Sequence, residues 1–156
     1  MLGAGAAFPD RVVRDPAGGE GPLSPAWAAG PALIALGHAE CGTTRLVLPY
    51  VQRLWTRRGA GSSVVLVVQE DAEGARGLAA DLGLTLPLRL DETPYPLSRD
   101  VGLTAVPSFF LVARDGRVVR SAEGYSRDDL EAFAAALGAA GPLYAADEPG
   151  PRHRPG

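Results

Sequence analysis

Two continuous apolar runs stand out in the first half of the chain, at residues 31–37 and 63–69. Turn residues bound the first run, and runs of this length are typical of strands that are covered on both faces. Between the two runs, apolar side chains recur at helical spacing. They are Leu46, Val47, Tyr50, Val51 and Leu54. This stripe predicts an amphipathic helix that begins at Gly42.

A second helix pattern follows the run at 63–69. Asp71 is expected to cap this helix and Gly83 to end it. Residues 86–90 then predict a third strand. Strands that alternate with helices in this way indicate a parallel sheet.

The pattern changes in the last third of the chain, where residues 106–113 form another apolar run. Asp-Gly and Glu-Gly turn signals bracket residues 117–122, which predicts an antiparallel strand pair. A capping pattern at Ser126 and Asp129 then predicts a final helix that stops at Gly138. The expected fold class is therefore α/β, with a central mixed sheet and helices on both faces.

The three parts of the chain differ in composition. Residues 31–139 carry the regular patterns and are expected to form the folded domain. Residues 1–30 are rich in Gly, Ala and Pro, so we expect an irregular, loosely packed lead-in with room for a short hairpin. Residues 140–156 contain four prolines and no periodicity, which predicts a disordered tail.

The composition narrows the function classes. The chain of 156 residues is 46% apolar and 21% charged, with a net charge of −3 and no arginine cluster, so it offers no footprint for nucleic acid. No apolar run is long enough to predict a membrane span, and no secretory signal is visible. A single cysteine excludes an internal disulfide. These observations lead us to expect a cytoplasmic protein.

That cysteine, Cys41, directly precedes the first predicted helix. The backbone N–H groups and dipole of a helix N-terminus favour the thiolate, which is the nucleophilic form of the thiol. A carboxylate at Glu40 should raise the pKa of the thiol, whereas Arg45, one turn along, should lower it. We expect the helix end to prevail over Glu40.

Three neighbours of Cys41 have alternative roles. A hydroxyl of Thr43 or Thr44 could donate to the thiolate, or it could cap the first helical turn. His38 could exchange a proton with the thiol, or it could be a structural residue at the strand end. His38 and Cys41 alone are too few ligands for a structural zinc site, so we expect neither a metal nor a cofactor.

The order of these elements resembles the thioredoxin superfamily, and within it the redoxin and TlpA-type branch related to AhpC/TSA proteins. The resemblance spans about residues 30–138, and an extra strand-helix unit separates the active-site helix from the Val-Pro strand. It is carried by Cys41-Gly-Thr-Thr44, by Pro49 inside the helix and by Thr104-Ala-Val-Pro-Ser-Phe-Phe-Leu111.

The resemblance implies roles for several residues. Cys41 would be the nucleophile, and Pro107 would have a cis peptide bond and lie against the thiol. The backbone of Val106 would pair with a bound polypeptide, and Gly42 and Thr43 would line the same substrate-binding side. Thr44 stands where thioredoxins carry a second cysteine, so a thiol from outside would have to resolve any mixed disulfide.

Three functions remain open at this point. The first is monothiol exchange with an oxidised protein or a low-molecular-weight disulfide, completed by an external thiol reductant. The second is a one-cysteine, peroxiredoxin- or glutathione-peroxidase-like hydroperoxide reductase. Cys41-Gly-Thr-Thr44 matches the Cys-Gly-x-Thr pattern of glutathione peroxidases, but the Gln and Asn-Phe partners of that family are absent. The third is a non-catalytic adaptor that binds partners through the Val-Pro edge. The sequence leaves the substrate and the oligomeric state undetermined.

Overall fold

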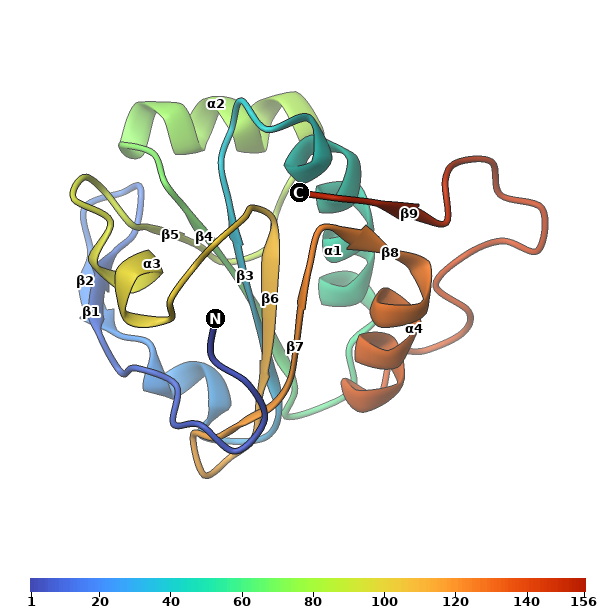
Figure 1. Cartoon of the computed structure of the whole chain (residues 1–156), viewed down its shortest axis with the longest axis horizontal. Helices are drawn as coiled ribbons and strands as arrows, with labels where there is room; N and C mark the ends of the chain where they lie inside the picture. The colour runs from blue at the N-terminus through green and yellow to red at the C-terminus, as the bar shows by residue number, and fades with distance from the viewer.

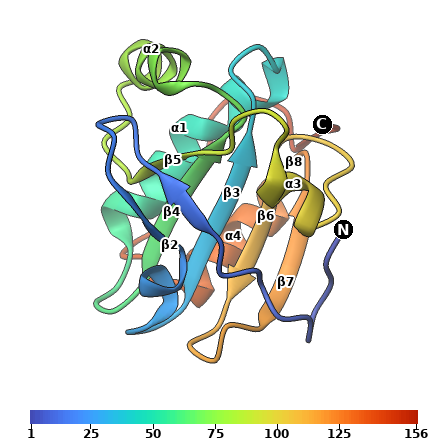
Figure 2. The same ribbon diagram turned by 90° about the vertical axis from the view of Figure 1, so that its left-hand side faces the viewer.

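Seven strands form one mixed sheet in the computed structural model, which describes all 156 residues. The strands are β1 (Val12–Arg14), β2 (Glu20–Pro22), β3 (Ala32–Gly37), β4 (Ser63–Val68), β5 (Leu88–Leu90), β6 (Ser108–Val112) and β7 (Val118–Glu123). Their order across the sheet is β2-β1-β5-β4-β3-β6-β7 (Figure 2). Strands β3, β4 and β5 are parallel, and the other pairings are antiparallel. The predicted α/β fold with a mixed sheet is thus confirmed.

The helices begin and end close to the signals in the sequence. They are η1 (Ser24–Trp27), a 3₁₀ helix, and the α-helices α1 (Gly42–Arg57), α2 (Ala72–Leu82), α3 (Pro96–Asp100) and α4 (Arg127–Ala136). The Asp71 carboxylate accepts from the N–H of Gly74 at 2.8 Å, and the Ser126 hydroxyl accepts from the N–H of Asp129 at 3.2 Å. Gly83 ends α2 in the left-handed conformation, at φ +64°, which glycine adopts readily.

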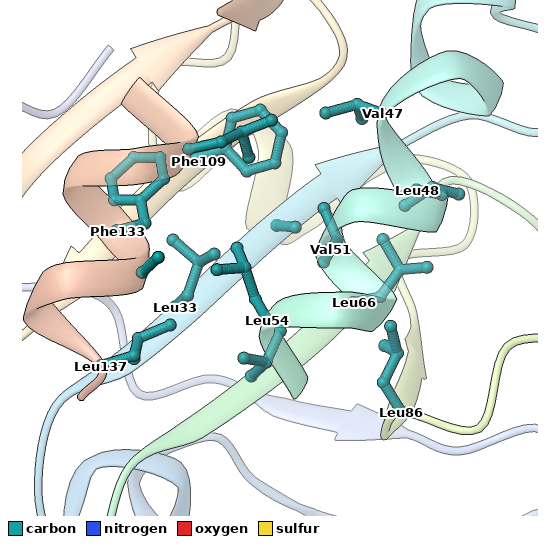
Figure 3. Packing of buried hydrophobic residues seen from close by; sticks show 14 of the residues in the cluster. Leu33, Val47, Leu48, Val51, Leu54, Leu66, Leu86, Phe109, Phe133 and Leu137 are labelled. Atoms are coloured by element: carbon teal, nitrogen blue, oxygen red, sulfur yellow. The ribbon is translucent and has the colours of Figure 1, made fainter. Parts of the chain in front are cut away.

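The larger part of the core lies between one face of the sheet and helices α1, α2 and α4 (Figures 1 and 3). Leu33 of β3 and Phe109 of β6 point from the sheet toward Leu54 of α1 and Phe133 of α4. All four side chains are buried. Burial of this apolar surface stabilises the fold, and α1 begins near the end of β3 and the start of β6.

The lead-in, residues 1–30, packs more tightly than the sequence predicts. It contains the expected hairpin, formed by β1 and β2, and β1 joins the sheet edge through a pairing with β5. Phe8 and Trp27 are buried, and their rings contact each other with centroids 5.8 Å apart. Phe8 also contacts Phe110 on the second face of the sheet. The physical reason is that this apolar face needs a cover, which the lead-in and α3 provide.

Residues 140–156 also differ from the prediction, because they are ordered against the domain and not disordered. Leu143 and Tyr144 are buried, and Glu148 forms an ion pair with Arg53 at 2.7 Å. Near its end the segment forms β9 (His153–Arg154), which pairs antiparallel with β8 (Tyr125–Ser126). The sequence pattern could not predict these contacts, because each contacting residue of the segment has its partner far away in the sequence.

Candidate active site around Cys41

Cys41 lies at the junction of strand β3 and helix α1. The strand ends at Gly37, and the N–H of Cys41 donates to the carbonyl of His38 at 3.1 Å, which closes the intervening turn. Cys41 is the N-cap of α1, with extended backbone angles, and its Sγ accepts from the N–H of Thr44 at 3.5 Å. The sulfur therefore takes the place of the side-chain oxygen that usually caps a helix.

The surroundings of Sγ favour its ionised form. Burial raises the pKa of the Cys41 thiol, but hydrogen bonds from the hydroxyl and N–H of Thr44 and from the N–H of Thr43 lower it. The positive charge of Arg154 lowers it further. The net result is a pKa below the ordinary value of a cysteine. Cys41 is also partly exposed, and its thiol is not deeply buried.

The loop before β6 lies on the other side of the sulfur. The Val106–Pro107 peptide bond is cis, and the Cys41 thiol donates to the Val106 carbonyl across 3.3 Å. The Ser108 hydroxyl donates to the Ala105 carbonyl at 2.7 Å, which ties the loop to the first residue of β6. A group 65 positions away in the sequence is thus held in contact with the thiol.

Thr44 has a structural and an electrostatic role at once. It is completely buried, and its hydroxyl oxygen accepts from the N–H of His38 at 3.5 Å. A Cβ atom at position 37 would lie only 2.7 Å from the methyl carbon of Thr44, so position 37 requires glycine. The position where the resemblance to thioredoxins would place a second cysteine therefore holds a fixed hydroxyl beside the sulfur.

Thr43 and Gly42 face residues from the C-terminal part of the chain. The Thr43 hydroxyl donates to the Pro155 carbonyl at 2.8 Å. A side chain at Gly42 would begin 3.3 Å from the Arg154 guanidinium. The group that both residues contact is a segment of the chain itself.

His38, Glu40 and Arg45 are near Cys41 in the sequence but make no hydrogen bond to its sulfur. The Nδ1 atom of His38 accepts from the N–H of Glu40 at 3.2 Å and lies 3.4 Å from the Glu70 carboxylate. Arg45 donates to the Ala39 carbonyl at 2.6 Å and pairs with Asp81 at 3.2 Å. The contacts of His38 and Arg45 order the loop before α1.

Two residues of this region were missed by the sequence reasoning. Glu70 fixes the loop by accepting from the N–H of Ala39 at 2.8 Å, and it follows β4 as His38 follows the parallel neighbour β3. That shared sheet edge is a signal that could have found it. Arg154 has no comparable signal, because its position depends on how residues 140–156 fold back.

The rest of the structure adds two findings. It contains no group of three or more His, Cys, Asp or Glu side chains arranged to hold a metal ion. None of the helices combines the length and the apolar character needed to cross a membrane.

The sequence and the structure were compared with known proteins. No protein-family model matches the sequence, and no curated protein matches it. Solved structures do match. A protein from Chlorobium tepidum, provisionally named thiol:disulfide interchange protein DsbE, superposes with a TM-score of 0.77 at 24% identity, covering 88% of this chain and 100% of its own. The chain has a thioredoxin-like fold.

Two further structures support the same fold. One is a protein from Bacteroides thetaiotaomicron, provisionally named a protein disulfide isomerase, with a TM-score of 0.78 at 18% identity, covering 88% of this chain and 92% of its own. The other is the peroxidoxin BcpB from Mycobacterium tuberculosis, with a TM-score of 0.74 at 15% identity, covering 88% and 97%. These thioredoxin-like neighbours have names from both disulfide and peroxide chemistry, so the fold alone does not select a reaction.

Proposed function

We propose that this protein is a monothiol thioredoxin-like oxidoreductase that exchanges disulfides through Cys41. The observation that carries the proposal is the position of Sγ. It is partly exposed at the N-cap of α1, has a lowered pKa and lies 3.3 Å from the carbonyl that precedes the cis proline. A buried structural cysteine would have a raised pKa and no such surroundings.

The reaction would proceed in two exchange steps. The Cys41 thiolate attacks one sulfur of a disulfide, a mixed disulfide forms, and the other half of the substrate leaves as a thiolate. The thiolate of an external thiol then attacks the substrate sulfur of the mixed disulfide and releases Cys41 as a thiolate. In the net exchange, one half of the substrate disulfide leaves as a thiolate, and the half that was bound to Cys41 ends in a disulfide with the external thiol.

Individual residues have distinct tasks in this scheme. Thr44, through its hydroxyl and its N–H, stabilises the negative charge of Cys41 before attack and when Cys41 is the leaving group. When Cys41 is ionised it no longer donates to Val106, so the Val106 carbonyl loses this hydrogen bond and can accept an N–H from a substrate that reaches it. Pro107 would pack against the substrate sulfur.

The external thiol is a requirement of the chain itself. Cys41 is the only cysteine, and Thr44 cannot attack a mixed disulfide in place of a thiol. A low-molecular-weight thiol or a partner protein must therefore complete each cycle. A reducing cytoplasm, which is part of this proposal, would provide such thiols.

The test uses the reduced full-length protein and an uncharged small disulfide. We expect one equivalent of mixed disulfide on Cys41 by mass spectrometry, its release by added thiol, and no adduct in the Cys41→Ser variant. The same protein is then mixed with hydroperoxide. Rapid peroxide consumption, with slow disulfide exchange, would assign the protein to the peroxidase class. A Cys41 that reacts with neither reagent would leave only a non-catalytic binding role.

A further inference from the structure

The segment formed by residues 152–156, here called the covering segment, lies on the substrate-binding side of Cys41. It includes β9 and extends beyond the edge of β8 toward the start of α1 (Figure 1). Its contacts come from three parts of the proposed site, namely the first turn of α1, the loop before β6 and the edge of β8. A segment in this position has consequences for which substrates can reach the sulfur.

The preceding residues hold the covering segment from one side. The hydroxyls of Tyr144 and Tyr125 lie 3.1 Å apart in the core, and the Arg127 guanidinium lies over the Tyr144 ring, 4.5 Å from its centre. Arg127 also donates to the Glu148 carbonyl at 2.9 Å. These contacts hold residues 144–148 against the start of α4, next to β8, which directly precedes α4 in the sequence.

The covering segment then runs as an extended strand. The N–H of Arg127 donates to the Arg152 carbonyl at 3.0 Å, and the segment pairs with β8, with Arg154 opposite Tyr125. An antiparallel pairing with a sheet edge is the way in which many domains bind an extended peptide. Here the peptide is part of the same chain.

The last residues of the segment contact the groups beside the sulfur. The Pro155 carbonyl accepts from the Thr43 hydroxyl at 2.8 Å. Gly156 lies so close to the Val106 carbonyl that a side chain there would begin 2.6 Å from its oxygen. The space in front of Val106, where a polypeptide substrate would pair, is therefore already filled by backbone.

We propose that the covering segment occupies the polypeptide-binding side of the Cys41 site, so that the folded protein reacts with small disulfides and accepts an extended polypeptide disulfide only when the segment is displaced. This inference rests on the proposed function of Cys41. The sulfur stays partly exposed beside the segment, which leaves access for a small reactant.

The contacts of the segment are few enough for displacement. All residues from 152 to 156 are exposed, and the pairing of β9 with β8 involves only two residues on each strand. A polypeptide that must compete with the segment binds with an affinity reduced by the fraction of molecules in which the segment is displaced. Removal of the segment should therefore accelerate polypeptide disulfides selectively.

Arg154 adds a second effect that the test must separate. Its guanidinium lies near Gly42, and its charge favours the Cys41 thiolate. Loss of Arg154 alone would slow the reaction with every disulfide by the same factor. Loss of the cover changes the ratio between two substrates, so the ratio is the informative quantity.

The experiment compares two activated disulfides with the same leaving group. A 2-pyridyl disulfide is attached either to a methyl group or to the central cysteine of an extended synthetic peptide, and release of 2-thiopyridone gives both rates. We expect deletion of residues 152–156 to raise the ratio of the peptide rate to the methyl rate about tenfold, because the competing strand is removed. Circular dichroism and thermal unfolding verify that the shortened chain is folded.

Two point variants are the controls. Arg154→Gln should lower both rates by the same factor and leave their ratio unchanged. Arg152→Gln removes an equal charge from the same segment, at a side chain that pairs with Asp128 on the surface, and should change neither rate. An unchanged ratio after the deletion, in a protein that reacts with the methyl disulfide, overturns this inference. Failure of the full-length protein to react with the methyl disulfide overturns the proposed function instead.

Discussion

The substitution Thr44→Val tests whether the hydroxyl beside the sulfur stabilises the thiolate. Valine has nearly the shape of threonine, so the buried position stays filled while the hydroxyl is lost. The hydroxyl lowers the pKa of Cys41, and the variant should therefore have a higher Cys41 pKa than the wild-type protein. The N–H of Thr44 is kept, so only part of the stabilisation disappears.

The magnitude follows from the strength of a hydrogen bond to a charged group. Such bonds contribute about 1.5–3 kcal/mol, and we take about 1 kcal/mol because the sulfur is partly exposed. This corresponds to about fivefold less thiolate at a pH below both pKa values. A thiolate of higher pKa is the stronger nucleophile, which offsets about half of the effect on a logarithmic scale. The alkylation rate should fall about two- to threefold at that pH.

The assay is the rate of alkylation by iodoacetamide, measured across pH in both proteins. Thr44→Ser is the matched control, because it keeps the hydroxyl and loses the methyl group that packs against Gly37. It should cost about 1 kcal/mol of stability and leave the pH profile close to that of the wild type. If the Val and Ser variants have the same pH profile, the hydroxyl does not act on the sulfur and this reasoning is refuted.

Three further predictions concern stability. Phe133→Ala should lower the free energy of unfolding by about 3–5 kcal/mol in urea denaturation, because it empties a buried site that contacts Phe109; a loss below about 1 kcal/mol would contradict this packing. Asp71→Ala should cost about 1 kcal/mol through loss of the cap on α2, whereas Asp71→Asn should retain most of it. The third prediction is a pH dependence of stability. Because the Cys41 pKa is lower in the folded state, the unfolded chain binds more protons at pH values between that pKa and about 8.5. The stability of the wild-type protein relative to Cys41→Ser should therefore rise with pH in this window, and the gain should be lost as pH falls through the folded pKa. Parallel stability curves for the two proteins would contradict the lowered pKa.

The order of elements and the place of the thiol could be predicted because they depend on local patterns. The buried runs that become β3 and β4 have no polar interruption, and Asp71 and Ser126 are caps whose partners are three residues away. The position of Cys41 follows from the end of a strand and the start of a helix, both of which are local features.

The position of residues 140–156, including the covering segment, could not be predicted in this way. Pro155 contacts Thr43 across 112 positions, and Glu148 contacts Arg53 across 95. Such contacts leave no period in the sequence, and the prolines around them are equally typical of disorder. The tight packing of the lead-in escaped prediction for a related reason, because Phe8 and Trp27 are buried singly and not as part of an amphipathic pattern.

The central claim is that Cys41 is an ionised, reachable nucleophile near neutral pH. The most direct measurement is the pH dependence of its alkylation in the native protein, with the same chain in denaturant as the internal reference. We predict a native midpoint clearly below that of the denatured chain, which should lie near 8.5. A native midpoint at or above the denatured one, or a sulfur that resists alkylation until the protein unfolds, would contradict the account.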